Sequence, residues 1–292
     1  MKLSIVIVNF NGQKHLRDCL VSLYEKISIA FEVIVVDNDS QDGSVNLIKN
    51  EFPEVLLVCN QKNYGFAKGN NIGAESACGE YILLLNNDTV LLDDLADAVN
   101  LLDSHQRIGI LGAKMLAPDQ SYRKSAGYFP LAHRLFRFSH LHRDDDGFHD
   151  GSFPDGRRDF IRVDWVEGSF LLVRKSLWTQ LGGLDETYFM YVEDVDFCYS
   201  VCQQGYQTVY YPVVKYIHVG GFGVARFKLL LAGFLKFHRK HSNVLMLGMV
   251  RFILFTGVLC RFVYFRFFSN KVIDKEKADA CLDAIRSVEW FK

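Results

Sequence analysis

Four groups of polar residues and glycines in the first third of the chain contain the side-chain types that bind polar ligands. Each group follows a short apolar run, and the four are Asn9-Phe10-Asn11-Gly12, Asp37-Asn38-Asp39-Ser40-Gln41-Asp42-Gly43, Asn60 with residues 63–71, and Asn86-Asn87-Asp88. Asn, Asp and Ser also cap helices, and capping explains any single group. Four such groups in succession favour a site for a polar ligand instead.

Two carboxylates in these groups match the needs of a nucleotide diphosphate. Asp37 suits a hydrogen bond to a base N–H or a ribose hydroxyl, and Asp88 suits a divalent cation, which prefers carboxylate and phosphate oxygens. The glycines do not form GxGxxG after the first apolar run, and no GxxxxGK[ST] occurs, so the dinucleotide fingerprint and the P-loop are both absent. We therefore expect a nucleotide diphosphate that lies across these strand ends.

A later acidic group, Glu193-Asp194-Val195-Asp196, offers candidates for general-base chemistry. A helix that begins at about Glu193 would keep its first-turn carboxylates ionised through the backbone N–H groups and the helix dipole. An ionised carboxylate can accept a proton from an attacking hydroxyl, although the lowered pKa expected at a helix start makes it a weaker base. The alternative is that the three acids only stabilise the start of a helix.

The elements that must position these groups alternate as in an α/β fold. Between the first two apolar runs, Leu16, Leu20 and Leu23 recur at helical spacing. Strands that alternate with helices indicate a mostly parallel sheet flanked by helices, with the ligand at the carboxyl ends of the strands. The expected strands are Leu3–Val8, Glu32–Asp37, Val55–Cys59, Tyr81–Leu85 and Ile108–Leu111.

Residues 117–160 interrupt this alternation. They are rich in Arg, His, Asp and Gly, and we expect a long loop whose basic residues, Arg123 among them, either cover an anionic ligand or are simply solvated. The elements expected after the loop are a strand-like run Ile161–Val173, a helix Ser176–Leu181, the helix from about Glu193 and a strand Thr208–Tyr211.

The end of the chain differs from the rest in charge. The whole sequence of 292 residues has 33 Lys and Arg against 34 Asp and Glu, so no global basic field points to nucleic acid. Residues 226–292, in contrast, carry 13 basic and 5 acidic groups. We expect a main domain over residues 1–225 and a basic helical tail over residues 226–292.

Within this tail, Val244–Phe265 is apolar enough and long enough to span a bilayer, but it contains Arg251 and Arg261. On a helical projection these two arginines share one face with Arg266, and the other face is Phe, Leu and Val. Lys236 and Lys240 join the basic face if the helix continues back through Ser242-Asn243. The pattern predicts an amphipathic helix in the interface of an anionic membrane, released by high salt. Packing on the main domain and a homodimer contact are the alternatives.

Five motifs together resemble the family 2 inverting glycosyltransferases of GT-A fold, and among them the bacterial rhamnosyltransferases. The motifs occur in the family's order within residues 1–220 and are Ser4-Ile5-Val6-Ile7-Val8-Asn9, Val35-Val36-Asp37-Asn38-Asp39-Ser40, Asn63-Tyr64-Gly65-Phe66-Ala67, Leu84-Leu85-Asn86-Asn87-Asp88 and Glu193-Asp194-Val195-Asp196. The resemblance implies a Rossmann-like GT-A sheet. It also implies transfer of a sugar from a nucleotide diphosphate sugar, usually with Mg²⁺ or Mn²⁺, with inversion of the anomeric carbon.

The resemblance also implies roles for individual residues. The residues expected to bind the donor are Val8, Asn9, Asp37 and Asp39 at the nucleoside, Asn63, Gly65, Phe66, Gly69 and Asn70 in a loop that wraps it, and Asn87 and Asp88. Asp88 is the metal carboxylate of the family's DxD signature, in which Asn86 replaces the first Asp. With one carboxylate left, phosphate, water and His218 are expected to complete the coordination. The family pattern places the general base on Asp194.

Trp165 together with Glu167-Gly168-Ser169 is expected to form the wall of the acceptor or donor sugar site, and Glu193 is expected there too. Core packing is the alternative for Trp165. The resemblance favours rhamnose from dTDP-rhamnose, transferred to a glycan or lipid-linked acceptor in bacterial cell-surface polysaccharide synthesis.

Three other functions stay open: a UDP-hexose transferase, a non-catalytic degenerate transferase subunit, and a sugar-phosphate nucleotidyltransferase. The turn Asn9-Phe10-Asn11-Gly12 disfavours the last, because that class shows a Gly-rich, Arg-containing loop there. Seven scattered cysteines without a CxxC pair indicate a reducing cytoplasm, and with the basic tail they predict a peripheral protein at the inner face of the cell membrane.

Overall fold

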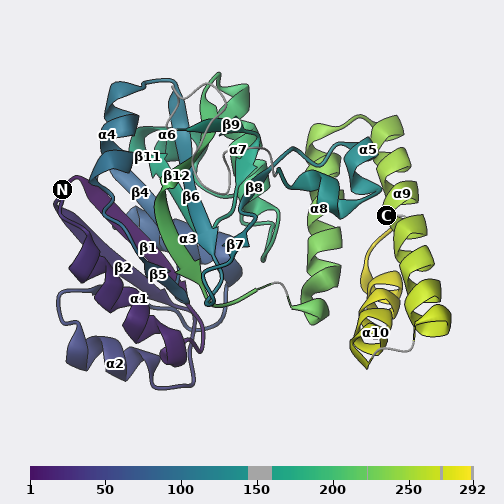
Figure 1. The fold of residues 1–292 in the computed structure, drawn as a ribbon, viewed down its shortest axis with the longest axis horizontal. Helices are drawn as coiled ribbons and strands as arrows, with labels where there is room; N and C mark the ends of the chain where they lie inside the picture. The colour runs from purple at the N-terminus through teal and green to yellow at the C-terminus, as the bar shows by residue number, and fades with distance from the viewer. Residues whose placement is uncertain (144–159, 222, 270–271, 291–292) are drawn as a thin grey trace. The chain divides into compact units, whose positions relative to one another are not determined.

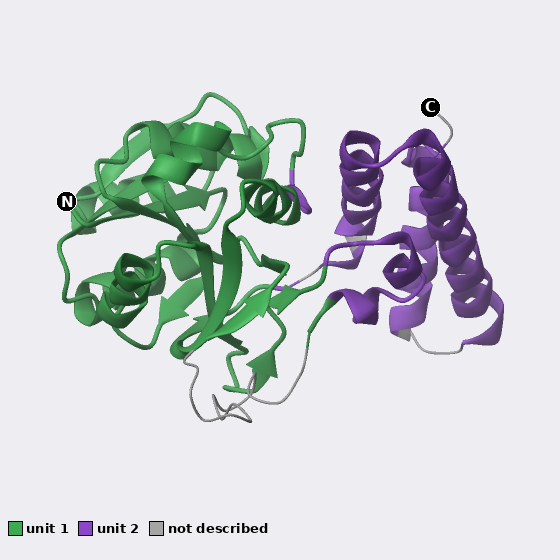
Figure 2. Cartoon of the chain, turned by 90° about the horizontal axis from the view of Figure 1, so that it is seen from above, with its two compact units in different colours: residues 1–128, 142–189, 194–220 green, residues 129–141, 190–193, 221–292 purple. Residues whose placement is uncertain are grey.

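The computed structural model describes residues 1–143, 160–221, 223–269 and 272–290, and these residues belong to two compact units (Figure 1, Figure 2). Unit 1 comprises residues 1–128, 142–189 and 194–220, and unit 2 comprises residues 129–141, 190–193 and 221–292. Unit 1 contains the sheet and almost every residue expected in the site. Unit 2 is helical.

Unit 1 is built on a mixed, mostly parallel sheet, which confirms the expected fold class. The buried strand β1 (Leu3–Asn9) pairs in parallel with β2 (Phe31–Asp37) and β4 (Tyr81–Asn86), as expected for strands that are apolar on both faces. The remaining strands of the main path are β3 (Leu56–Cys59), β5 (Thr89–Leu91), β6 (Ile108–Leu116), β11 (Phe170–Arg174) and β12 (Gln207–His218), and the spatial order is β3-β2-β1-β4-β11-β6-β12-β5.

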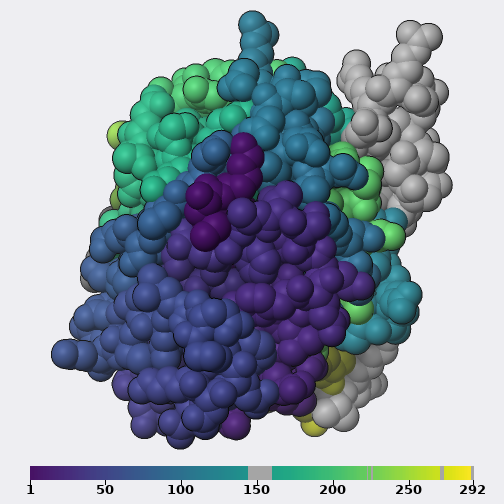
Figure 3. All heavy atoms as spheres, turned by 90° about the vertical axis from the view of Figure 1, so that its left-hand side faces the viewer, coloured from purple at the N-terminus to yellow at the C-terminus, as the bar shows by residue number. Residues whose placement is uncertain are grey.

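Helices cover both faces of this sheet (Figure 1). On one face α1 (Gln13–Lys26) and α4 (Ala96–Ser104) share a buried apolar cluster with Ile5 and Ile7 of β1. On the other face α3 (Gly65–Glu75) approaches β1 closely, because a Cβ at Gly69 would come within 2.9 Å of the Val8 methyl carbons. Three further helices belong mainly to this unit: α2 (Ser44–Glu51), α6 (Lys175–Leu181) and α7 (Glu193–Gln203). In the space-filling view the first third of the chain, purple to blue, forms one continuous face (Figure 3).

The registers of the strands bring the polar groups to one edge. Asn9 of β1 is level with Asp37 of β2, and Val8 is level with Asn86 of β4. Strand β11 runs antiparallel to β4, so the turn that precedes it also lies at the carboxyl end of β4. The end of β12 pairs with β5, which sets His218 opposite Thr89. The topology therefore gathers five segments that are separated in the sequence: the ends of β1, β2, β4 and β12 and the turn before β11.

The middle of the chain differs from the sequence-based prediction. The expected single strand over 161–173 is wrong: the chain forms β9 (Ile161–Val163) on β12, then leaves the main sheet for β10 (Trp165–Val166), which pairs with β8 (Ala126–Gly127), and returns in β11. The expected loop 117–160 contains, besides β8, the short strand β7 (Tyr122–Arg123) and, in unit 2, α5 (Ala132–Leu135) and the 3₁₀ turn η1 (Phe138–Leu141). Residues 144–159 of that loop lie outside the described part of the chain.

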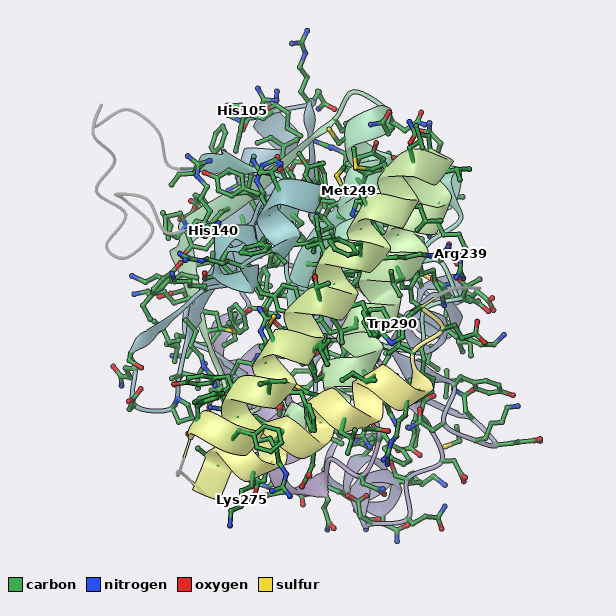
Figure 4. The ribbon with its side chains drawn as sticks, turned by 90° about the vertical axis from the view of Figure 1, so that its right-hand side faces the viewer. His105, His140, Arg239, Met249, Lys275 and Trp290 are labelled. Carbon is green, nitrogen blue, oxygen red and sulfur yellow. The ribbon has the colours of Figure 1, made fainter. Side chains whose placement is uncertain are left out.

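Unit 2 is a packed group of helices: the 3₁₀ turn η2 (Val224–Arg226), α8 (Phe227–His241), α9 (Val244–Val263) with its π-helical extension η3 (Tyr264–Phe268), and α10 (Val272–Ser287). Figure 4 shows α9 and α10 side by side, with Met249 near the start of α9 and Lys275 near the start of α10. Val250, Leu254 and Val258 of α9 are fully buried. The helix does not continue through residues 242–243, because Ser242 is extended and the Asn243 side chain caps α9 at the Met246 N–H.

Candidate active site

The carboxyl ends of β1, β2 and β4 are joined by side-chain hydrogen bonds. Asn9 Nδ2 donates to Asp37 Oδ1 at 2.8 Å and to Ser40 Oγ at 3.1 Å, and Asn87 Nδ2 donates to Asn9 Oδ1 at 2.6 Å. Asn9 and Asp37 are almost completely buried, whereas Asp39 is exposed at the tip of the turn with a φ of +65°. The Asn9 amide therefore positions Asp37 and Asn87, whereas the Asp39 carboxylate is accessible to solvent.

Asn38 belongs to the same edge, although the family resemblance gave it no role. Its Nδ2 donates to Asn63 Oδ1 at 3.3 Å and to the Gly65 carbonyl at 3.0 Å, and its Oδ1 accepts from Asn60 Nδ2 at 2.8 Å. The signal for it in the sequence was its place between Asp37 and Asp39. Asn38 fastens the loop after β3 to the end of β2.

The loop expected to wrap the donor has a shape that requires glycine. Gly65 has a φ of +84°, and a Cβ there would collide with the carbonyl of Phe189, which accepts a hydrogen bond from the Phe66 N–H at 2.8 Å. Further along α3, Asn70 is buried and donates to the Phe66 carbonyl at 2.9 Å. Its Oδ1 has no hydrogen-bond partner among the described residues. An unpartnered buried oxygen is costly, so it marks a place where a ligand or water can donate.

Asp88 and His218 face each other across the ends of β4 and β12. The His218 Nε2 lies 3.2 Å from Asp88 Oδ1 and 3.2 Å from Asn86 Nδ2. A Cβ at Gly220 would collide with Asp88 Oδ2, so glycine keeps space free beside the carboxylate. Arg123 fixes this segment by donating to the carbonyls of His218 at 2.8 Å and Gly220 at 2.6 Å.

This pair fits a divalent cation in part. Burial opposes the ionisation of Asp88, but the hydrogen bond and charge of His218 and the Gly220 N–H lower its pKa below the ordinary value. A carboxylate and an imidazole are both accepted ligands of Mn²⁺, and the missing Cβ at Gly220 leaves room beside them. Among the described residues no three His, Cys, Asp or Glu side chains are grouped for a metal. Substrate oxygens or water would have to complete the coordination.

Asp194 lies in the first turn of α7, on the other side of the turn that precedes β11. Gly168 N–H donates to its Oδ2 at 2.8 Å, and the Val195 N–H donates to its Oδ1 at 2.8 Å. Burial raises the pKa of Asp194 above its ordinary value, against the lowering effect of these N–H groups. The prediction that a lowered pKa makes this acid a weak base is therefore wrong. A raised pKa makes the ionised form a stronger proton acceptor.

Glu167 stands between these two centres. Its Oε2 accepts from Ser169 Oγ at 3.2 Å, and Ser169 Oγ also shares a hydrogen bond of 2.8 Å with the Tyr216 hydroxyl. Burial raises the pKa of Glu167 to about 7; the charge of Asp194 also raises it, and that of His218 lowers it. Sequence reasoning had grouped Glu167 with Trp165, Gly168 and Ser169 at the expected sugar wall, without a role of its own.

Trp165 and Glu193, which were also expected at the sugar wall, are both buried. Trp165 is 7% exposed, its Nε1 donates to the Tyr128 carbonyl at 2.8 Å, and its ring meets the edge of His142. These contacts match the core-packing alternative for Trp165. Glu193 is 4% exposed and belongs to unit 2. The third acid of the motif, Asp196, is buried and accepts from the Tyr188 hydroxyl at 3.3 Å.

A shallow pocket of about 530 Å³ opens elsewhere in unit 1. It is lined by Glu80, Tyr81, Arg174, Lys175, Ser176 and Thr179. These residues lie at the amino end of β4 and the adjoining end of β11, which is the sheet edge opposite Asp88. Ligands of open α/β sheets bind at the carboxyl edge, so we assign the chemistry to the polar edge and not to this pocket.

The sequence of the chain is similar to those of known glycosyltransferases. A sequence model of the family described as glycosyl transferase family 2 matches residues 4–167. An N-acetylglucosaminyl-diphospho-decaprenol L-rhamnosyltransferase of Mycobacterium tuberculosis is 30% identical over 236 residues, which cover 74% of this chain and 75% of the relative. The rhamnosyltransferase WbbL of Escherichia coli is 30% identical over 167 residues, covering 53% of this chain and 61% of WbbL.

A solved structure shows the same fold at low sequence identity. The mannosyltransferase PcManGT from Pyrobaculum calidifontis, in complex with GDP-Man and Mn²⁺, has a TM-score of 0.59 and 16% identity. The match covers 97% of this chain and 80% of that one. The sheet and its flanking helices are thus those of the GT-A fold.

Proposed function

Because the chain belongs to glycosyl transferase family 2 and is a glycosyltransferase, we propose the following reaction for it. It transfers the sugar of a nucleotide diphosphate sugar to an acceptor hydroxyl, with inversion of the anomeric carbon. The observation that carries the proposal is that one turn, Glu167-Gly168-Ser169, connects two acidic centres by hydrogen bonds. The first centre is Asp88 with His218, and the second is Asp194. Asn86 N–H donates to the Ser169 carbonyl at 3.2 Å, and the neighbouring Gly168 N–H donates to Asp194.

The proposed reaction is one in-line displacement. Asp194 accepts the proton of the acceptor hydroxyl as its oxygen attacks the anomeric carbon, and the bond to the diphosphate breaks on the opposite side. Asp88 and His218 would hold Mg²⁺ or Mn²⁺, which when bound supplies positive charge for the leaving diphosphate. Asp37 would bind the nucleoside, and Asn9 holds Asp37 in place for it. Asp39 and the loop with Asn63, Gly65, Phe66, Gly69 and Asn70 would close over the donor.

For the donor we propose dTDP-rhamnose, supported by the two rhamnosyltransferase relatives. A UDP-hexose is the alternative donor, and a non-catalytic subunit is the alternative role, since Asn86-Asn87-Asp88 keeps one carboxylate of its signature. For the acceptor we propose a lipid-linked saccharide of cell-surface polysaccharide synthesis, because the mycobacterial relative is named for a decaprenol-linked acceptor.

A thermal-shift screen tests the donor site. dTDP-rhamnose, UDP-GlcNAc, UDP-glucose and GDP-mannose are each added with and without Mn²⁺. Because stabilisation by binding follows mass action, the true donor gives the largest rise in Tm, and Mn²⁺ increases it. Release of nucleoside diphosphate from the best donor then separates an enzyme from a degenerate subunit. No shift with any of the four compounds would contradict the proposed donor class.

We also propose that unit 2 attaches the protein to the inner face of the cell membrane. Helix Val244–Phe268 is long and apolar enough to cross a bilayer by length and composition. Apart from Arg266, its exposed side chains are mostly apolar and recur at helical spacing, and they include Leu245, Met249, Phe252, Leu259, Val263 and Phe267. Arg261 instead lies within unit 2, with its guanidinium 4.8 Å from the centre of the Phe138 ring. The exposed apolar stripe of α9 therefore supports insertion into the interface, with the net basic charge of residues 226–292 adding anionic selectivity.

Vesicle sedimentation tests the attachment. The protein is expected to bind phosphatidylglycerol vesicles more strongly than phosphatidylcholine vesicles, and high salt should remove the difference but leave part of the binding. Leu259→Ser should weaken binding, whereas Leu56→Ser, which changes a similarly exposed leucine of β3 in unit 1, should not. Equal binding of both variants, or none by the wild type at low salt, would contradict the proposal. A concentration-dependent dimer that Leu259→Ser disrupts would assign the stripe to the homodimer alternative.

A further inference from the structure

The turn Glu167-Gly168-Ser169 connects the two halves of the proposed site. At one side, the Ser169 carbonyl accepts from the Asn86 N–H at 3.2 Å. At the other, the Gly168 N–H donates to Asp194 Oδ2 at 2.8 Å. A Cβ at Gly168 would come within 2.9 Å of the Phe66 ring and within 3.6 Å of the Asp194 Cβ, so glycine allows this close approach. The turn thus lies between the leaving-group side and the base side of the reaction.

Only one oxygen of the Glu167 carboxylate is hydrogen-bonded to another described residue. Oε2 accepts from Ser169 Oγ at 3.2 Å, and among the described residues Oε1 has no hydrogen-bond partner. The side chain is partly buried, and its carboxylate interacts electrostatically with both Asp194 and His218. A partly buried carboxylate beside a second acid is unfavourable unless a donor satisfies its free oxygen. Within the part of the chain that the structure describes, no such donor reaches Oε1.

The place and chemistry of Glu167 select one kind of ligand. A metal role is disfavoured because, within the described residues, no third metal-binding side chain accompanies Asp88 and His218. A phosphate would be repelled by a carboxylate. A sugar hydroxyl is a neutral donor, and the transferred sugar must occupy the space between the diphosphate and the base.

We propose that Glu167 accepts a hydrogen bond from a hydroxyl of the transferred sugar and thereby takes part in donor selection. This inference rests on the proposed function, since it requires a nucleotide-sugar donor in the site. Ser169 acts as a positioning residue because its hydroxyl donates to Oε2 and leaves Oε1 for the sugar. Tyr216 supports Ser169 through the hydrogen bond between the two hydroxyls.

Titration calorimetry on the full-length protein with Mn²⁺ separates the sugar from the nucleotide. Wild type, Glu167→Ala and Glu167→Gln are titrated with dTDP and dTDP-rhamnose, and with UDP and UDP-GlcNAc. Hydrogen bonds to charged groups are strong enough that Glu167→Ala should weaken the preferred nucleotide sugar by about tenfold or more and leave the free diphosphate within about twofold. Glu167→Gln keeps an acceptor oxygen and should lose less. Glu80→Ala, at the opposite end of β4, should change neither affinity.

Deoxygenated analogues of the preferred donor distinguish a direct hydrogen bond from a purely structural role of Glu167. A structural role would give the same loss of affinity for every analogue. With the analogue that lacks the bound hydroxyl, wild type and Glu167→Ala should bind equally. If the loss caused by Glu167→Ala is the same for every analogue, or equal for diphosphate and nucleotide sugar, the inference is overturned while the transferase proposal stands. If wild type binds none of the nucleotide sugars, the proposed function itself fails.

Discussion

The raised pKa of Glu167 predicts a pH-dependent cost to the folded state. The pKa lies at about 7 in the folded chain against 4.5 for an ordinary Glu, mainly through burial. The folded protein therefore binds a proton more tightly than the unfolded chain does, so stability is greatest below the unfolded pKa and is lost as the pH rises through about 7. This pKa shift of Glu167 corresponds to a loss of at most about 3 kcal/mol in the free energy of unfolding at high pH. Because solvent reaches the carboxyl, we expect a loss of about 1–3 kcal/mol.

Glu167→Gln removes this titration and keeps the shape of the side chain. Relative to wild type, the variant should gain about 1–3 kcal/mol in unfolding free energy between about pH 5 and about pH 8. Asp194 raises the pKa of Glu167 and His218 and Arg123 lower it, and all three are present in both proteins. The difference between the two proteins therefore reports the titration of Glu167 together with its charge interactions with these neighbours.

Urea unfolding followed by tryptophan fluorescence measures this difference. Trp165 and Trp178 belong to unit 1 and Trp290 to unit 2, so both proteins carry Trp290→Phe and the signal reports unit 1 alone. The reasoning is refuted if the stability difference between variant and parent is the same at the two pH values. A variant that becomes less stable than its parent as the pH rises would contradict the predicted sign.

Three further outcomes are expected. Asp88→Ala should weaken Mn²⁺-dependent donor binding by about tenfold or more, and Asn86→Ala should weaken it less, because only Asp88 is charged; equal metal titrations of wild type and Asp88→Ala would contradict this. Gly220→Ala should reduce Mn²⁺-dependent binding without weakening nucleotide binding in EDTA, since the new Cβ collides with the Asp88 carboxylate; unchanged metal affinity would refute the crowding argument. Asn71→Ala should lower the unfolding free energy by about 1–3 kcal/mol, because the amide bonds both the N–H and the carbonyl of Leu184; a loss below about 0.5 kcal/mol would make those bonds marginal.

Local sequence patterns predicted the first half of unit 1 well. The runs of β-branched residues at 3–8 and 32–37 correspond to β1 and β2 within one residue at each end, because strands buried on both faces are recognisable from composition alone. The helix expected from about Glu193 begins at that residue. The polar strand ends meet at one edge because parallel pairing places Asn9 level with Asp37.

Contacts between distant segments could not be predicted from the sequence. The pairing of Gly168 with Asp194 and of Ser169 with Tyr216 depends on the detour of the chain through β10. The strand-like run 161–173 gave no sign of this detour. The raised pKa of Asp194 follows from burial, whereas its place at a helix start had suggested a lowered one. The exposed side of α9 was also not predictable, since a helical projection gives the two faces and not the one that packs inward.

The central claim is that Asp194 is the base in transfer from a nucleotide sugar, and paired measurements on Asp194→Asn test it most directly. The variant and wild type are compared for donor Kd by calorimetry and for transfer rate at saturating donor, with Asp97→Asn, another first-turn helix acid, as the control. We predict that Asp194→Asn lowers the rate by about a hundredfold or more with donor Kd within about threefold, and that the control changes neither. Retention by Asp194→Asn of more than about a tenth of the wild-type rate would contradict the account.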